Sequence, residues 1–249
     1  SPVAEIRVKD LANGEERIIP TDPTLIESAP KISPDGSTVC YDGVRQGTRR
    51  TFIMAGKDTT AKEACQGCVI TGFFGDPRFA LIVEEGRRLA KLDLSTGERT
   101  PLLETSTGRI SDPALSPDDR WVAFVLSRPD GRPELRIAPL DGAPPAEDRW
   151  ILAYSEPNAL ASPAWSPNGR ILYYLAERDG PCALWSQPLE PGSKAPSGEP
   201  TKIFDPRPFG ISLNIPRGNA TLAVAKDKLA LWGGQAKGNI FMATPRPRK

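Results

Sequence analysis

Acidic side chains are the first candidates for chemistry in this chain, because it contains no histidine. Without histidine there is no Ser-His-Asp triad, no histidine general base and no histidine metal site. The sequence also lacks a G-x-S-x-G nucleophile turn, a phosphate-binding loop and a dinucleotide fingerprint. Three carboxylates, Glu27, Asp112 and Glu156, follow segments of apolar sequence, and paired carboxylates can hydrolyse glycosidic bonds. We therefore expect a chain that is not an enzyme, with a carboxylate-based glycan hydrolase as the alternative.

The four cysteines are the second candidates. Cys65 and Cys68 form a C-x-x-C pair, which is too few ligands for a zinc site, so no metal or cofactor is expected. The pair is either a local disulfide in an oxidising compartment or two reduced thiols at the entry of a strand. Cys40 lies in an apolar run and is expected to be buried. Cys182 is expected to be an exposed free thiol at the tip of a hairpin.

The elements that position these residues form a tandem array. One pattern recurs four times: a short apolar segment, a turn of the Pro-Asp/Asn-Gly type and a longer apolar run. The copies are Ala29–Tyr41, Thr71–Ile82, Asp112–Phe124 and Ser162–Tyr174. Units of about 40 to 50 residues are typical of four-stranded propeller blades, and runs without polar alternation indicate strands covered on both faces. The pattern predicts an all-β β-propeller of four-stranded antiparallel blades, with a β-sandwich as the alternative.

The expected organisation is a single propeller domain over residues 1–249, with five or six blades. Complete blades are predicted at residues 24–64, 65–104, 107–155 and 158–205, a partial blade at 4–20 and a last blade at 207–244. In the blade at 107–155 the strands are predicted at 113–115, 121–126, 135–139 and 150–154. The strand count fits neither five nor six complete blades. Either a spare strand lies on an edge, or the chain is part of a longer protein.

Arginines recur in the loops between the second and third strand of successive blades. These loops and the connections between blades share one side of a propeller, which we call the loop face; the opposite side is the turn face. The arginines expected to bind a ligand there are Arg49, Arg50, Arg128 and Arg178, and the acidic candidates on the connections are Glu27 and Asp112. Arginine suits such a role because its planar guanidinium donates several hydrogen bonds. The same loops hold a similar number of Asp and Glu residues, so ordinary solvated loop charge is the alternative.

Composition excludes two classes of partner. The formal net charge is +1, whereas binding to nucleic acid by counterion release favours a clear basic surplus. No apolar run reaches about 18 residues, the length at which a transmembrane helix becomes a candidate. We therefore expect no nucleic-acid binding and no membrane insertion by this chain. The oligomeric state is left open.

The turns carry a family resemblance. Ser33–Gly36 reads Ser-Pro-Asp-Gly, and variants stand at Ser116–Asp119 and Ser166–Gly169. They resemble the TolB-type, WD-repeat-like propeller repeats of bacterial proteins, and the resemblance covers nearly the whole chain. Phe74–Pro77 departs from this turn in one repeat, and the last repeat has no such turn. The resemblance concerns repeats and not a catalytic motif, so no functional residue is carried over.

A longer series of segments resembles the propeller domains that follow a transmembrane segment in acidobacterial-type serine/threonine kinases and winged-helix regulators. The segments are Cys65–Cys68, Trp121–Phe124, Leu172–Gly180 and Gly238–Phe241. This resemblance implies a non-catalytic propeller, the sensory or scaffolding domain of a bacterial membrane-anchored regulator such as a serine/threonine kinase. It implies an extracytoplasmic, periplasmic location, with a cytoplasmic one as the alternative. The expected partner is a protein, a peptide or a small extracellular ligand at the loop face; the propeller cap of a peptidase is a further alternative.

Overall fold

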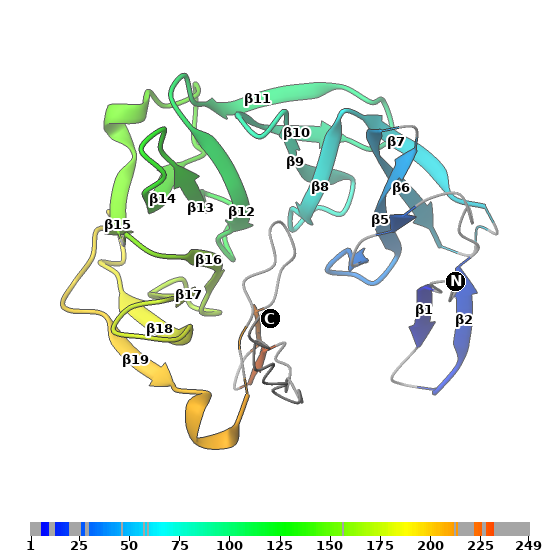
Figure 1. Cartoon of the computed structure of the whole chain (residues 1–249). Helices are drawn as coiled ribbons and strands as arrows, with labels where there is room; N and C mark the ends of the chain where they lie inside the picture. The colour runs from blue at the N-terminus through cyan, green and yellow to red at the C-terminus, as the bar shows by residue number, and fades with distance from the viewer. Residues whose placement is uncertain are drawn as a thin grey trace, which may run out of the picture.

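The chain folds into antiparallel sheets that are arranged in an arc around a common centre (Figure 1). The computed structural model describes residues 6–9, 13–19, 26–27, 30–45, 47–56, 58, 60–155, 157–211, 213, 222–225 and 228–231. Besides strands, this part contains only two short 3-10 helices, η1 (Glu147–Arg149) and η2 (Arg207–Phe209). The prediction of an all-β propeller built from four-stranded antiparallel blades is confirmed.

Three blades have four strands in chain order, with the first strand nearest the centre (Figure 1). The first comprises β8 (Cys68–Phe73), β9 (Phe79–Glu84), β10 (Arg88–Asp93) and β11 (Arg99–Glu104). The second comprises β12 (Arg109–Leu115), β13 (Trp121–Ser127), β14 (Pro133–Pro139) and β15 (Ile151–Ser155). The third comprises β16 (Leu160–Trp165), β17 (Ile171–Ala176), β18 (Ala183–Pro188) and β19 (Thr201–Phe204).

The sheet before these blades has an interrupted inner strand. Both β3 (Ile26–Glu27) and β4 (Lys31–Ile32) pair with β5 (Thr38–Arg45), which is followed by β6 (Thr48–Ala55) and β7 (Lys62–Gln66). Two hairpins stand at the ends of the arc: β1 (Ile6–Lys9) with β2 (Glu16–Ile19), and β20 (Leu222–Val224) with β21 (Leu229–Leu231). The third strand predicted for the last blade, at 239–244, lies outside the described residues.

The recurring serine locks each tight turn. The Ser33 hydroxyl donates to the Asp35 carboxylate at 2.6 Å and accepts from the Thr38 amide at 2.9 Å. Gly36 closes the turn by donating its amide to the Ser33 carbonyl at 2.9 Å, with φ of 72°. The same serine contacts recur at Ser116 with the Trp121 amide and at Ser166 with the Ile171 amide. The side chains that make the turn recognisable in the sequence therefore also build it.

Contacts between neighbouring blades make the core. Within β13 the residues from Val122 to Leu126 are all buried, so this strand is covered on both faces. Phe124 meets Trp150 of its own blade edge to face, with ring centroids 5.1 Å apart, and shares a cluster with Leu81 and Leu89 of the preceding blade. One core cluster joins Val125 and Leu135 of one blade to Leu172 of the next. This explains why the middle strands lack polar alternation.

The two free cysteines are both buried, so one expectation is confirmed and the other is wrong. Cys40 is buried, as expected. Cys182 is buried instead of exposed, because the segment before β18 packs against Leu213 and Leu222 from later in the chain. Burial raises the pKa of the Cys182 thiol to about 12, so this cysteine remains a protonated, apolar core residue.

The turn geometry gives a first prediction. Gly36 has open space around the position of a Cβ atom, so a substitution there acts through the backbone conformation alone. Gly36→Val is expected to lower the free energy of unfolding by about 1 kcal/mol or more, because a β-branched residue is strained at positive φ. Gly36→Asn is the control with a smaller loss, since Asn tolerates this region. Equal stability of the valine variant and the wild type in urea unfolding would contradict the described turn.

Candidate functional site: the central channel

A hollow of about 1500 Å³ occupies the centre of the propeller and is called the channel below. Its wall is made by the inner strands β8, β12, β16 and β20, with Lys31 from β4. At the loop face the lining includes Arg49, Gly86 and Arg109, and at the turn face it reaches Pro167. The inner strands therefore place side chains from several blades around one shared space.

Each of the three regular inner strands contains an irregularity at a matching position. The pairing register shifts between Ser111 and Ala114 in β12, and at corresponding places in β8 and β16. At the shift in β12, Asp112 has φ of 50°, and at that in β16, Ser162 has φ of 54°. Such values are uncommon for residues other than glycine and mark strained backbone. Bulges of this kind re-aim side chains, here toward the channel.

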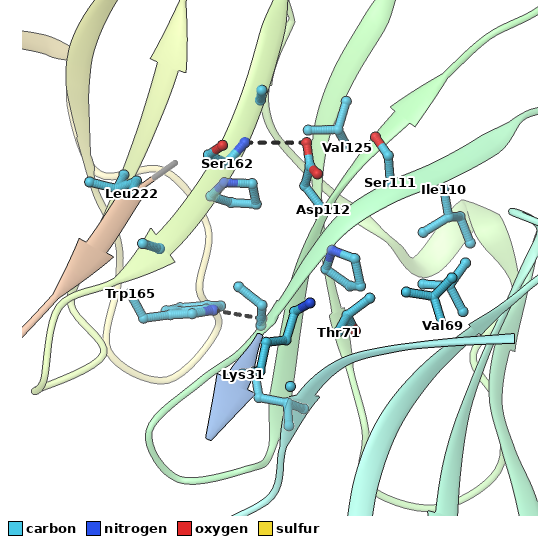
Figure 2. A pocket seen from close by; sticks show the side chains of 18 of the residues that line it. Lys31, Val69, Thr71, Ile110, Ser111, Asp112, Val125, Ser162, Trp165 and Leu222 are labelled. Carbon is cyan, nitrogen blue, oxygen red and sulfur yellow. Dashed lines mark hydrogen bonds between the residues drawn. The ribbon is translucent and has the colours of Figure 1, made fainter. Parts of the chain in front are cut away.

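Asp112 is a charged residue of the channel wall (Figure 2). Its carboxylate accepts a hydrogen bond from the Ser162 amide at 3.4 Å, which joins two neighbouring blades. Burial raises the pKa of Asp112 to about 6, and the Ser162 amide and the Lys31 charge offset this only in part. Within the described part of the chain, no cation forms an ion pair with Asp112. A strained, half-buried carboxylate that lines a hollow without an ion pair is a candidate functional group.

Two further residues of the wall were missed by the sequence analysis. Lys31 extends from β4 into the same hollow as Asp112 and Thr71 (Figure 2). Trp165 forms part of the wall, and its indole N–H donates to the Ala114 carbonyl at 3.0 Å, which fixes the ring. Both lie one or two positions before the serine of a turn, in the first apolar segment of a repeat. This position relative to the turn serine is the feature of the sequence that could have identified them.

The four candidate arginines lie in different environments. Arg49 lines the channel. Arg50 pairs with Glu63 at 2.7 Å, and Arg128 pairs with Glu134 at 3.0 Å and with Glu147 at 3.1 Å. Arg178 lies over the rings of Tyr154 and Trp185, with Asp179 at 3.8 Å. Of these four side chains, Arg49 alone belongs to the channel wall.

The acidic candidates also differ. Asp112 was predicted in a connection between blades, but it lies within β12, a strand that begins at Arg109 and not at residue 113 as predicted. The first half of β12 is polar because it faces the channel, and this polarity concealed the strand in the sequence. Glu27 belongs to β3, but its side chain is outside the described part of the structure. Glu156 is outside the described residues.

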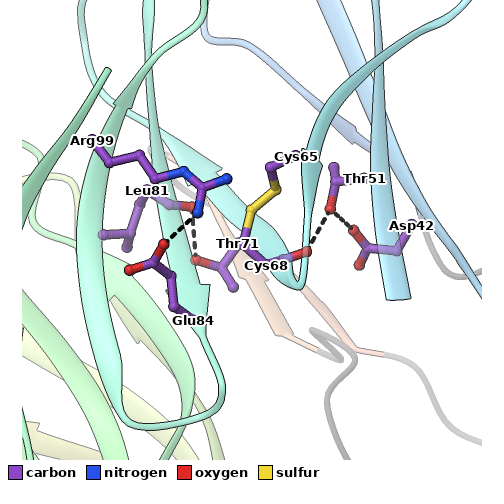
Figure 3. The surroundings of a disulfide bond; sticks show 8 residues. All are labelled: Asp42, Thr51, Cys65, Cys68, Thr71, Leu81, Glu84 and Arg99. Carbon is purple, nitrogen blue, oxygen red and sulfur yellow. Dashed lines mark hydrogen bonds and ion pairs between the residues drawn. A yellow bond between two sulfur atoms is a disulfide. The ribbon is translucent and has the colours of Figure 1, made fainter. Parts of the chain in front are cut away.

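The C-x-x-C pair forms a disulfide between Cys65 and Cys68 (Figure 3). It links β7 to β8, and both sulfur-bearing residues are buried. The Thr51 hydroxyl lies between the Asp42 carboxylate at 2.7 Å and the Cys68 carbonyl at 3.1 Å. The intervening Gly67 lines the channel and donates its amide to the Arg49 carbonyl at 3.1 Å. The disulfide therefore fixes a segment of the channel rim.

The described residues contain neither a metal-binding cluster nor a membrane-spanning helix. No group of three or more His, Cys, Asp or Glu side chains in the described ranges is arranged to hold a metal ion. No helix within those ranges is long and apolar enough to cross a membrane.

Comparisons with known proteins bear on the fold. No family model matches the chain, and no curated protein matches it at a significant level. TolB from Acinetobacter baumannii is similar in structure, with a TM-score of 0.59 and 19% identity over 79% of this chain and 50% of that one. An oligogalacturonate lyase in complex with manganese gives a TM-score of 0.58 with 14% identity, over 81% of this chain and 60% of the lyase.

A puromycin-hydrolysing peptidase from Mycobacterium tuberculosis is also similar, with a TM-score of 0.56 and 19% identity. The match covers 72% of this chain and 32% of the peptidase. The chain thus spans 60% or less of each of these three proteins. Together they show a TolB-like β-propeller fold, which is found in binding proteins and in enzymes alike.

The raised pKa of Asp112 gives a second prediction. Protonation of this carboxyl stabilises the fold at low pH, and that contribution is lost as the pH rises through about 6. Asp112→Asn is therefore expected to stabilise the protein by up to about 3 kcal/mol near pH 8 and to change little below about pH 4. Asn also tolerates the positive φ at this position.

The measurement is urea unfolding across this pH range, with Asp118→Asn as the matched control. The Ser116 hydroxyl holds the pKa of Asp118 below its ordinary value, so removal of this charge is expected to destabilise the fold at neutral pH. An Asp112→Asn variant that is less stable than the wild type near pH 8 would contradict the assignment of Asp112 as a costly buried charge.

The contacts of Arg128 give a third prediction. Arg128→Ala is expected to lower the free energy of unfolding by about 1 kcal/mol, because it removes charge-assisted bonds to Glu134 and Glu147. The control, Arg132→Ala, changes an exposed arginine on the same face and should stay within about 0.5 kcal/mol of the wild type. Chemical denaturation measures the free energy of unfolding of both variants. Equal effects of the two substitutions would count against a structural role for Arg128.

Proposed function

We propose that this chain is a non-catalytic binding propeller whose ligand, a peptide segment or a small molecule, enters the channel from the loop face. The observation that supports this most directly is Asp112. This side chain is half-buried and, among the described residues, forms no ion pair; it stands on strained backbone in the wall of a hollow of about 1500 Å³. A purely structural position has no need of this charge, since Asn would fit there at a lower energetic cost.

The wall also supplies the features of a recognition site. Trp165 gives a fixed aromatic surface, while Lys31 and Asp112 supply charges of opposite sign that do not pair with each other. Ligand sites in proteins are mostly apolar concave spaces with a few placed polar groups, and this channel has that character. Of the candidate arginines, we assign ligand contact to Arg49; Arg50, Arg128 and Arg178 border the site and shape the loops around it.

A second candidate function rests on the same carboxyl. A pKa of about 6 suits a general acid, so a carboxylate-based glycan hydrolase remains the alternative. Such an enzyme needs a second carboxylate facing the first across the bound sugar. Among the described residues, the other carboxylate of the channel wall is Glu85, on the turn between β9 and β10.

The wider setting is also part of the proposal. We propose an extracytoplasmic domain that senses a ligand or scaffolds a partner for a bacterial membrane-anchored regulator such as a serine/threonine kinase. The Cys65–Cys68 disulfide supports an oxidising compartment, where such bonds persist. In the alternative setting, the propeller cap of a peptidase, the same channel would lie on the path of the substrate.

A plugged channel tests the proposed function. Val69 lines the channel, so Val69→Trp is expected to fill it, whereas Thr100→Trp adds the same ring on the exposed outer strand β11. In NMR titrations with a diverse library of short peptides and small molecules, ligands of the wild type should shift the signals of Thr71, Ser111 and the Trp165 indole. Val69→Trp should weaken this binding at least tenfold, and Thr100→Trp should leave it unchanged.

Two results would count against the proposal. Ligands that bind both tryptophan variants as well as the wild type would place the site outside the channel. Turnover of a glycan in the same library, abolished by Asp112→Asn, would show that the chain is the hydrolase of the second candidate.

A further inference from the structure

We infer that the channel selects a ligand that carries carboxylate groups, which bind to the cations of the channel wall. This inference rests on the proposed function and gives the chemical class of its ligand. The chain as a whole is nearly neutral, so its net charge gives no reason to expect an acidic ligand. The positions of the cations in the channel wall do.

The cations of the channel wall are unneutralised. Lys31, Arg49 and Arg109 line the channel, and none of their side chains forms a hydrogen bond or an ion pair within the described part of the chain. Away from the channel, several arginines of the same face are paired with carboxylates. These are Arg50 with Glu63, Arg88 with Glu84 and Glu104, and Arg128 with Glu134 and Glu147. Within the described ranges, the two carboxylates of the wall, Glu85 and Asp112, form no ion pair with these cations.

The Arg109 guanidinium lies against the turn between β9 and β10. A Cβ atom on Gly86 would lie 2.7 Å from the Arg109 Nη2 atom, so only glycine lets the guanidinium lie against this turn. Gly86 also has φ of 68°, and its carbonyl accepts the amide of Ile110 at 2.7 Å. Gly86 therefore leaves the space that the Arg109 cation occupies at the rim. A guanidinium is well suited to bind a carboxylate in two-point contact.

The acidic groups of the wall complete the pattern. Glu85 is exposed at the rim, and Asp112 lies deeper, where burial favours its neutral form near pH 6. Three cations therefore face two carboxylates, one of them partly protonated. Asp112 can accept N–H or O–H donors from a ligand whose own carboxylates meet Arg49, Arg109 and Lys31.

The size of the channel favours an extended ligand. Pockets for drug-sized molecules are about 300 to 1000 Å³, and this hollow is larger, at about 1500 Å³. A short chain that bears carboxylates along its length, and N–H or O–H groups between them, would fit this description. Acidic peptides and oligomers of acidic sugars share that chemistry.

Three defined probes test the inference by isothermal titration calorimetry: tetraglutamate, tetraglutamine and trigalacturonate. Tetraglutamate should bind the wild type at least tenfold more tightly than tetraglutamine, with an affinity that falls as salt is raised. Arg49→Glu combined with Arg109→Glu should weaken the binding of tetraglutamate tenfold or more. The matched control combines Arg87→Glu and Arg132→Glu, which change the same charge on exposed residues of the same face outside the channel, and should stay within twofold.

A charge-conserving variant separates position from charge. Gly86→Ala is expected to displace the Arg109 guanidinium and to weaken tetraglutamate binding severalfold, while melting curves verify that each variant is folded. Binding of trigalacturonate without tetraglutamate would support the inference and identify the acidic sugar as the source of the carboxylates. Equal binding of tetraglutamate and tetraglutamine, or equal losses in the channel and control reversals, would overturn it. If uncharged library ligands still bound in the channel, the proposed function would survive that result.

Discussion

Face-to-face packing of neighbouring blades is the interaction on which the rest of this structure depends. A middle strand such as β13, buried from Val122 to Leu126, is stable only when another blade covers each of its faces. Apolar clusters that group Val125 with Leu172 of the next blade, and Phe124 with Leu81 and Leu89 of the preceding blade, meet that need. Blades stacked in this way must radiate from a centre, so their inner strands converge around a shared space. The channel is thus a geometric consequence of the core.

The inner strands have several irregular features at the channel. They contain polar residues, register shifts and the positive φ angles of Asp112 and Ser162. Positive φ angles also occur in turns such as those at Asp119 and Asp179, but Asp112 and Ser162 have them inside strands that line the channel. Sites of this kind are where natural proteins usually depart from consistency for the sake of function. The hydrogen bond from Ser162 to Asp112 couples two blades at that position.

The pairing of charged side chains also differs between the outer parts of the blades and the channel wall. On the outer parts of the blades, arginines are matched with carboxylates of their own sheet, as for Arg50 with Glu63 and Arg88 with Glu104. Such exposed pairs contribute little to stability, but they cancel the field around the rim. Among the described residues, the channel cations Lys31, Arg49 and Arg109 form no such pair. This is the distribution of charge from which we propose an acidic ligand, and the overall net charge of +1 does not reveal it.

The sequence alone determined the hairpins, their turns and the propeller class, because apolar runs and the Ser-Pro-Asp-Gly turns act over a few neighbouring residues. Ser33 and Gly36 do in the structure what their types predict. Tertiary structure alone decided that Asp112 lies in a strand, that Cys182 is buried and that Arg49 faces the channel while Arg128 does not. Each of these outcomes depends on residues from other blades or from distant segments. The exposure and charge balance of a side chain are set by such through-space neighbours, and the spacing of residues along one chain does not specify them.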